Sequence, residues 1–430
     1  MKRRSFLPPR KESRALRLLI TPLVAAGLMT VPAEARISHI IHVSVDGLRG
    51  DFLRALVEER GSQYFGFSRL QREGAVTYNA RCDYSHSITI PNHTSMLTGR
   101  PVIAEAPLPP EIQHGYTTNY TIITDLLQEQ GSPVGYKAST FDRVHDRGLR
   151  TALLLSKEKM SIFARSWGPD HGAPDTDGED NGRNKIDLTA IHEGNTAPLI
   201  NRLVTEMDGN FPAYTFLHLC DPDYAGHGSG WSSQNWRTAV KGADTQLSLI
   251  LAALDDRPVL KASTALILSA DHGGGVPDYT HLDPEKIENI TIPLIIWGAG
   301  IPAGVDAHTL FSNRTDPGPE RISNTNPDQP LRNGDTGNIA MALLGLPPVE
   351  GSFHRPVFAP GLEILRYLPG QPANSVTVRW PFYLTGWRLQ RNASLDRETW
   401  EDVRISGDEC SHTEQTLPGT RQFFRLVQPN

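Results

Sequence analysis

The sequence predicts an α/β protein in which helices cover both faces of a mostly parallel central sheet, followed by a small β module. Between residues 37 and 348, apolar runs rich in β-branched residues alternate with longer helical patterns, which is typical of parallel strands joined by helices. Acidic residues follow the ends of these runs, where an open α/β sheet places its binding site. Beyond residue 362, short aromatic and β-branched runs alternate with turn residues.

Four runs have the composition of central strands, because each is nearly continuous in Val, Ile, Leu or Phe. They cover residues 37–45, 213–219, 265–269 and 293–297. Helical patterns lie in the segments between and after them. These patterns cover residues 121–130, 196–207, 236–254 and 337–344, and Gly131 and Gly345 follow the first and the last.

The length of 430 residues is enough for one large domain and one small one. We predict a main domain over residues 36–362, a linker rich in Pro, Gly, Asn and Ser over 363–375, and a β-sandwich-like module over 376–430. The sequence of the module contains no candidate catalytic residues. Its role in binding a carbohydrate, the envelope or a partner, or in stabilising the chain, stays open.

The first 35 residues have the three-part pattern of a cleavable secretory signal. Seven basic residues precede an apolar stretch over 18–31, and Ala33-Glu34-Ala35 has the small residues of a cleavage site at its first and last positions. Cleavage is expected after Ala35, which predicts a periplasmic or secreted protein. An uncleaved anchor helix is the weaker alternative, because Pro22 and Gly27 interrupt a short stretch. No later apolar run could span a bilayer, so no stable membrane span is expected after cleavage.

The charge of the chain disfavours one class of partner. Cleavage removes seven basic and two acidic residues and changes the formal net charge from −6 to −11. Nucleic-acid affinity comes from Lys and Arg on phosphates, so binding of a nucleic acid duplex is not expected. The oligomeric state stays open.

The three cysteines, Cys82, Cys220 and Cys410, allow one disulfide at most. A bridge between Cys82 and Cys220 stays open, although packing as buried thiols is favoured, since two distant thiols need close, aligned Cβ atoms to join.

Acidic residues follow three of the predicted strands. Asp46 follows the first, Asp221 and Asp223 follow the second, and Asp271 with His272 follows the third. Because the carboxyl ends of parallel strands meet at one edge of a sheet, we expect these side chains to lie close together. Several carboxylates tolerate such closeness only when cations lie between them.

Two further histidines complete a ligand set for metal ions. His227 lies four residues after Asp223, and His281 lies in the loop before the fourth predicted strand. Three Asp and three His suit a pair of zinc ions, with another divalent metal as the alternative.

Thr89 is predicted to lie at the N-terminus of a helix, because Pro91 suits the first helical position and Gly99 the end. Backbone amides and the helix dipole at such a site favour an alkoxide and an incoming phosphoryl group. Metal coordination lowers the pKa of a hydroxyl, which makes Thr89 the candidate nucleophile.

At these residues the chain resembles the type I phosphodiesterase and nucleotide pyrophosphatase family of the alkaline phosphatase superfamily, over roughly residues 37–350. Leu282 follows His281 where family members commonly have Gly, which is a departure. Five stretches carry the resemblance in the right order: Val43-Ser44-Val45-Asp46-Gly47, Thr89-Ile90-Pro91-Asn92-His93, Pro222-Asp223-Tyr224-Ala225-Gly226-His227, Ser269-Ala270-Asp271-His272-Gly273-Gly274, and Thr280-His281 ahead of Ile292-Pro293-Leu294-Ile295-Ile296-Trp297-Gly298.

The resemblance implies an alkaline phosphatase-like fold and hydrolysis of a small phosphate ester, a diester or nucleotide being expected. Thr89 would attack phosphorus and form a covalent phospho-threonine, and Asn92 would donate a hydrogen bond to a phosphate oxygen. The implied zinc ligands are Asp223, His227 and His281 for one ion, and Asp46, Asp271, His272 and the Thr89 oxygen for the other.

Several alternatives stay open. A phosphomonoesterase or a phosphonate hydrolase would use the same ligands. A non-catalytic, metal-stabilised envelope binding protein is the alternative of another class, disfavoured because ligands and nucleophile are all present. A sulfatase is disfavoured, because sulfatases of this fold need Cys or Ser followed by x-Pro-x-Arg, and Asn92 and His93 follow Pro91 here.

Other residues near the motifs receive weaker assignments. Asp221 is expected to orient a neighbouring ligand. Four histidines are expected to be hydrogen-bonded bystanders, namely His86, His93, His114 and His218. The residues that could contact a nucleotide, without a ranking among them, are Tyr84, Tyr116, Asn119 and Tyr120.

Overall fold

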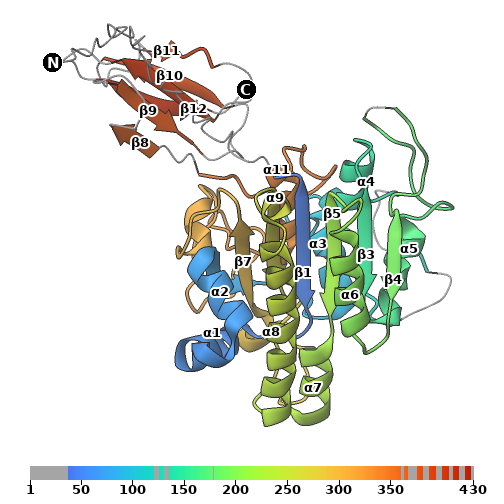
Figure 1. Ribbon diagram of the computed structural model, residues 1–430. Helices are drawn as coiled ribbons and strands as arrows, with labels where there is room; N and C mark the ends of the chain where they lie inside the picture. The colour runs from blue at the N-terminus through green and yellow to red at the C-terminus, as the bar shows by residue number, and fades with distance from the viewer. Residues whose placement is uncertain are drawn as a thin grey trace, which may run out of the picture. The chain divides into compact units, whose positions relative to one another are not determined.

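The computed structural model (Figure 1) describes residues 37–120, 125–129, 135–177, 179–359, 363–366, 375–380, 387–393, 400–405, 410–415 and 422–427. The predicted signal over residues 1–35 lies outside the described residues, as do residues 121–124 and 130 of the predicted helix over 121–130. The described part of that helix contains only the 3-10 helix at Leu127–Glu129. Within the described part, no helix combines the length and the apolar character needed to cross a membrane.

A seven-stranded sheet forms the centre of the main domain, in the order β2-β7-β6-β1-β5-β3-β4. Strands β6, β1, β5, β3 and β4 pair in parallel, whereas β7 is antiparallel to both of its neighbours. The predicted mostly parallel sheet is confirmed. Its strands are β1 (His39–Val45), β2 (Ala75–Arg81), β3 (Thr151–Leu155), β4 (Leu188–Ile191), β5 (Tyr214–Leu219), β6 (Thr264–Ser269) and β7 (Thr291–Gly298).

All four predicted strands are present, as β1, β5, β6 and β7. The fourth is antiparallel to β6, and the longest helix in the connection between them is the four-residue α10 (Ile287–Ile290). Three strands were not predicted. Of these, β3 is short but completely buried, and β4 is a partly exposed strand at the end of the sheet.

Helices cover both faces of this sheet (Figure 1). On one face α8 contacts α2 and α6, and on the other α11 contacts α3 and α4. The helices before β5 are α1 (Gly50–Arg60), α2 (Phe65–Glu73), α3 (Thr89–Thr98), α4 (Thr140–His145), α5 (Ser161–Ser166) and α6 (Ala197–Glu206). Those after β5 are α7 (Asp221–Ser229), α8 (Gln234–Asp255), α9 (Pro258–Lys261), α10 and α11 (Thr336–Leu343). The short 3-10 helices are η1 (Gly61–Gln63), η2 (Pro110–Ile112), η3 (Leu127–Glu129), η4 (Glu158–Met160), η5 (Ala307–Leu310) and η6 (Asn333–Asp335).

Three predicted helices are confirmed, since residues 196–207, 236–254 and 337–344 correspond to α6, α8 and α11. The predicted helix after Thr89 is α3, and Thr89 is its first residue. Pro91 is the third helical residue rather than the first. Gly99 ends α3 in the left-handed conformation with φ 65°, which an L side chain would strain.

The C-terminal residues form antiparallel β structure, as predicted. Two three-stranded sheets have the orders β11-β10-β13 and β12-β9-β8 within the described residues. The strand β8 falls inside the predicted linker over 363–375 and pairs with β9, so β structure begins earlier than expected. The strands are β8 (Glu363–Arg366), β9 (Ser375–Arg379), β10 (Arg388–Asn392), β11 (Glu401–Asp402), β12 (Ser411–Gln415) and β13 (Phe423–Val427).

Candidate active site

Charged side chains follow the carboxyl ends of four adjacent parallel strands. Asp271 follows β6, Asp46 follows β1, Asp223 lies on α7 after β5, and Lys157 follows β3. All four residues are buried, and none exposes more than 2% of its surface. The predicted gathering of carboxylates at one sheet edge is therefore present, together with a lysine that was not predicted.

Three histidines near this edge use Nδ1 for a backbone carbonyl and leave Nε2 for a ligand. His227 Nδ1 lies 2.9 Å from the Tyr279 carbonyl, and His272 Nδ1 lies 2.9 Å from the Gly273 carbonyl. His281 Nδ1 lies 2.5 Å from the Ser87 carbonyl. A carbonyl can only accept, so each Nδ1 donates and each Nε2 carries a lone pair. This arrangement fixes the tautomer that metal-binding histidines use.

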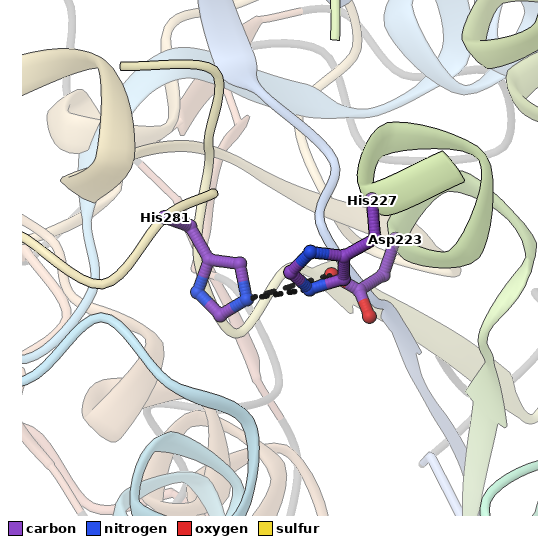
Figure 2. Close-up of side chains that lie close together, drawn as sticks. All are labelled: Asp223, His227 and His281. Atoms are coloured by element: carbon purple, nitrogen blue, oxygen red, sulfur yellow. Dashed lines mark hydrogen bonds and ion pairs between the residues drawn. The ribbon is translucent and has the colours of Figure 1, made fainter. Parts of the chain in front are cut away.

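Two clusters of candidate ligand atoms share Asp223. Asp223, His227 and His281 form one cluster (Figure 2), and Asp46, Asp223 and His272 form the other, each with its ligand atoms within 4.8 Å of one another. The first is the set predicted for one zinc. Asp271 joins the second cluster through Oδ2, which lies 3.2 Å from His272 Nε2.

The separations in these clusters match the donor spacing of a zinc ion. Asp223 Oδ1 lies 3.4 Å from His227 Nε2 and 3.7 Å from His281 Nε2, and the two Nε2 atoms are 3.2 Å apart (Figure 2). Ligands about 2.0 Å from one tetrahedral zinc lie roughly 3.3 Å from each other. Two imidazole lone pairs facing each other at this separation repel unless a cation lies between them.

Buried ligand atoms without hydrogen-bond partners mark the same place. An unpaired buried polar atom is costly, so each needs an explanation. Among the described residues, the buried atoms without a partner include Asp46 Oδ1, Asp223 Oδ1, Asp271 Oδ2, His272 Nε2 and Thr89 Oγ1. All five belong to the predicted ligand set, and metal coordination would satisfy them together. The residues present therefore fit a metal centre.

The other carboxylate oxygens are already engaged. Lys157 Nζ lies 2.7 Å from Asp46 Oδ2 and 2.5 Å from Asp223 Oδ2. His218 Nε2 lies 3.0 Å from Asp46 Oδ2. Asp271 Oδ1 accepts hydrogen bonds from the backbone amides of Gly47 and His272, at 3.1 and 3.0 Å. Each carboxylate thus uses one oxygen for the protein and leaves the other open.

These contacts shift the pKa values of the charged groups in different directions. Burial raises the pKa of Asp46, but Lys157 and His218 outweigh it and hold that pKa well below its usual value. Burial and the charge of Asp46 raise the pKa of Asp271 well above its usual value. Burial lowers the pKa of Lys157, but Asp46, Asp223 and Asp271 outweigh it and raise that pKa. A cation beside Asp271 would lower this pKa and favour the carboxylate form that a metal ligand needs.

Thr89 lies at the N-terminus of α3, as predicted, and is buried. The amide of the next residue, Ile90, donates to Asn119 Oδ1 at 3.0 Å. The carbonyl of Thr89 contacts His93 Nδ1 at 2.8 Å, and His93 Nε2 contacts Ser44 Oγ on β1 at 2.9 Å. These contacts fix the backbone of Thr89 and leave its hydroxyl without a partner.

Asn92 does not fit its predicted role, because its amide group is fully used inside the protein. Its Nδ2 donates to the carbonyls of His86 and Ile88, at 2.8 and 3.0 Å. Its Oδ1 accepts from the Asp83 amide and from Asn333 Nδ2, at 2.9 Å each. Asn92 has no donor left for a phosphate oxygen. It instead ties α3 to Asn333, which also donates to the carbonyl of Asp271 at 3.1 Å.

The expected bystander histidines are all hydrogen-bonded. His86 contacts Ser85 Oγ at 2.8 Å, and His114 contacts Ser95 Oγ at 3.2 Å. His218 contacts Asp46, and His93 contacts Ser44, as described above. The sequence offered no sign of the His218 contact, because the residue lies inside β5 and only the pairing of β5 with β1 brings it to Asp46.

The four candidates for nucleotide contact have different surroundings. Tyr116 is completely buried, and the Arg321 guanidinium covers one face of the half-buried Tyr84 ring at 3.6 Å. Tyr120 is exposed. Asn119 lies next to Thr89, and its Oδ1 also accepts from Lys159 Nζ at 3.2 Å.

Trp231 packs against two of the candidate ligands, His227 and His281. Its ring centre lies 5.4 Å from that of His227 and 5.9 Å from that of His281. Its Nε1 donates to the carbonyl of Gly47 at 2.9 Å, next to Asp46. A Cβ at Gly274 would lie 2.3 Å from the indole, so a glycine is required there.

Cys82 and Cys220 are buried free thiols, in agreement with packing rather than a disulfide.

Known proteins support the interpretation of the motifs. The family described as Type I phosphodiesterase / nucleotide pyrophosphatase matches residues 130–288. This segment includes Asp223, His227, Asp271, His272 and His281. Asp46 and Thr89 lie before it in the sequence and are not covered by the match. A search of curated proteins found no relative.

Solved structures with low sequence identity are similar to this chain. Human ectonucleotide pyrophosphatase / phosphodiesterase 5 is 11% identical, with 72% of this chain and 95% of that chain covered and a TM-score of 0.48. The murine protein, as an inactive form in complex with AMP, is 11% identical, with coverage of 72% and 96% and a TM-score of 0.47. An alkaline phosphatase superfamily protein from Vibrio parahaemolyticus is 14% identical, with coverage of 88% and 85% and a TM-score of 0.46.

The family match over residues 130–288 agrees with the resemblance drawn from the motifs in this segment, and it supports a phosphoric ester hydrolase.

Proposed function

We propose that the chain is an exported two-zinc phosphodiesterase that cleaves its substrate through a covalent phospho-threonine at Thr89. The observation that carries this proposal is the group of five buried, unpartnered ligand atoms that includes the Thr89 hydroxyl. A non-catalytic binding protein would have no need for an unpartnered nucleophile beside the ligand atoms, since a buried hydroxyl without a partner costs stability.

The first proposed ligand set is the first cluster, and the second takes Asp46 and His272 from the second cluster and adds Asp271 and Thr89. Asp223, His227 and His281 would hold one zinc ion through Asp223 Oδ1 and the two Nε2 atoms. The second ion would be held by Asp46, Asp271, His272 and the Thr89 oxygen. When bound, the two ions supply positive charge that lowers the pKa of the Thr89 hydroxyl and stabilises the departing oxygen.

The chain itself positions the nucleophile. The contacts of Ile90 with Asn119 and of His93 with Ser44 hold the first turn of α3 against β1. The positive end of the helix dipole then favours a negative phosphoryl group at Thr89. Thr89 Oγ1 attacks phosphorus, the P–O bond to one ester group breaks, and that group leaves with its electron pair. Water then cleaves the phospho-threonine and restores the hydroxyl.

The substrate we expect is a phosphate diester, with a nucleotide among the candidates. A phosphomonoesterase or phosphonate hydrolase is the second candidate, and one observation favours it. Lys157 and Lys159 add positive charge near the three carboxylates, which suits a substrate with a second negative charge.

A panel of nitrophenyl esters distinguishes these substrates. The panel contains nitrophenyl phosphate, nitrophenyl nucleoside monophosphate and nitrophenyl phenylphosphonate, assayed with the zinc-loaded protein. We expect the largest kcat/KM for the nucleoside diester. A preference of about tenfold or more for the monoester would favour the second candidate, and no turnover of any member would contradict a hydrolase of this site.

The covalent step is tested by acid quenching during turnover. We expect a peptide that contains Thr89 with the mass of a phosphoryl group, plus the retained organic group when the substrate is a diester. Rapid turnover with no adduct at Thr89 would mean that water attacks phosphorus directly, and the covalent proposal would fail.

A further inference from the structure

Lys157 contacts the carboxylates of the proposed metal site but is neither a proposed ligand nor the nucleophile. It follows β3, and its side chain is 3% exposed. The ring of Tyr224 on α7 lies 4.9 Å from Nζ and covers the ammonium group. The lysine is therefore held inside the protein rather than extended toward solvent.

The contacts of Lys157 divide the two carboxylates into inner and outer oxygens. Nζ binds Oδ2 of Asp46 and Oδ2 of Asp223, and Oδ1 of each has no partner. Asp223 Oδ1 instead faces the Nε2 atoms of His227 and His281. The ammonium group thus binds the Oδ2 atoms, and the Oδ1 atoms stay available as ligands.

Electrostatics gives this arrangement a direct consequence. Asp46, Asp223 and Asp271 are buried together, and carboxylates in one buried site repel each other. An ammonium group between two of them compensates part of that charge with or without metal. Zinc compensates the same carboxylates, so lysine and zinc satisfy one electrostatic need and repel each other when both are present.

We propose that Lys157 is a built-in counter-ion of the metal site that keeps the metal-free protein folded, at the expense of zinc affinity. This inference rests on the proposed function only in taking the cluster as a zinc site. The stabilising role applies to the protein before zinc binds.

Lys185 provides a matched control elsewhere in the fold. It is also fully buried and also contacts two carboxylates, Asp146 at 3.0 Å and Asp175. None of the oxygens of Asp146 or Asp175 is among the unpartnered buried atoms of the described residues. Removing Lys185 should therefore destabilise the protein equally with and without zinc.

The experiment measures thermal unfolding of the full mature chain and of the variants Lys157→Met and Lys185→Met, after chelation and after zinc loading. Methionine keeps the length of the side chain and removes the charge. Without zinc, we expect both variants to unfold about 5 °C or more below the wild type. With zinc, Lys157→Met should recover most of this loss and Lys185→Met none of it.

Zinc titration against a chromophoric chelator supplies the second measurement. We expect Lys157→Met to bind zinc about tenfold or more tightly than the wild type, because a positive charge near the ions is gone. Lys157→Gln is the second variant, since its amide can still donate to one carboxylate. Its loss of thermal stability should also be recovered with zinc, and both this loss and its gain in zinc affinity should be smaller than those of Lys157→Met.

Each result decides the inference. If Lys157→Met lowers the unfolding temperature by the same amount with and without zinc, Lys157 is an ordinary structural lysine and the proposal is overturned. Weaker zinc binding, or failure of both variants to fold even with zinc, would overturn it as well. If the wild type binds one zinc ion and Lys157→Met binds two, the ammonium group occupies a metal position. If the wild type binds none, the hydrolase proposal fails, whereas the stability of the metal-free variants still tests Lys157.

Discussion

Lys157 and Lys185 are both buried and each contacts two carboxylates, but their surroundings differ. Beside Lys185, Asp146 Oδ2 accepts from the amide and hydroxyl of Thr176, at 3.1 and 2.7 Å. Asp175 accepts from His145 at 2.9 Å and from the Asn181 amide at 2.7 Å. Beside Lys157, one oxygen of each carboxylate has no partner.

The types of residue alone therefore do not distinguish the cluster around Lys157 from the cluster around Lys185. His145, Asp146 and Asp175 lie close enough together to hold a metal ion, as do the residues of the candidate active site. The difference is that the cluster around Lys185 satisfies its carboxylates with its own donors, whereas the cluster around Lys157 keeps ligand atoms open. Open buried atoms cost stability, so a protein keeps them where a bound species completes them.

The largest expected effect concerns the unpartnered hydroxyl of Thr89. Thr89→Ala should lower turnover by at least about a thousandfold and leave the zinc content unchanged, because all six side-chain ligands remain. Thr89→Ser should keep substantial activity, since it retains a hydroxyl. Thr94→Ala is the matched control on the same helix, because its hydroxyl is already bonded to the carbonyl of Ile90. Steady-state kinetics and metal analysis check these outcomes, and near-normal turnover of Thr89→Ala would remove the nucleophile from the proposal.

The next effect compares one aspartate from each cluster. Asp46→Asn should reduce bound zinc from about two ions per chain and lower kcat by about a hundredfold or more, because an open ligand oxygen loses its charge. Asp146→Asn should leave zinc content and kcat near the wild-type values and lower only the unfolding midpoint. Equal zinc loss in both variants would show that the open atoms do not distinguish the clusters.

Asn92 provides a third comparison, because it lies at the site but all the polar atoms of its side chain already have hydrogen-bond partners. Asn92→Ala removes four hydrogen bonds and should lower the free energy of unfolding by roughly 2 kcal/mol, with less than about a threefold change in KM. Denaturant unfolding and kinetics check this. A large rise in KM with unchanged stability would restore the phosphate contact that was predicted from the sequence.

The smallest effect concerns the C-terminal β module. Every residue of both clusters precedes residue 359, so a chain that ends there should keep its turnover number, if it folds. This end point removes β8 together with its partner β9 instead of separating the two paired strands. A folded but inactive truncation would show that the module shapes the active site.

Much of this site could be predicted from the sequence, because parallel strands deliver the residues that follow them to one edge. Asp46, Asp223 and Asp271 each follow a long apolar run, and such runs mark buried strands clearly. Thr89 is predictable for a similar reason, since Gly99 marks the end of its helix.

The unpredicted parts depend on pairing between distant strands. Lys157 follows a run of only five buried residues, which is too short to separate a strand from other apolar segments. The hydrogen bonds of Asn92 inside the protein were not predicted, because partners such as Asn333 are far away in the sequence. The direction of β7 likewise depends on its pairing with β6 and β2.

The position of Trp231 gives the molecule an optical property. Its indole packs edge-on against the ring of His227 on α7, and its Nε1 donates to the carbonyl of Gly47, the residue after Asp46. Indole emission depends on nearby charge and on proton donors such as imidazolium. Zinc titration should therefore change the fluorescence of the wild type, and the change should disappear in Trp231→Phe. The protein thus contains its own reporter of metal loading, which allows metal binding to be followed in real time without a substrate.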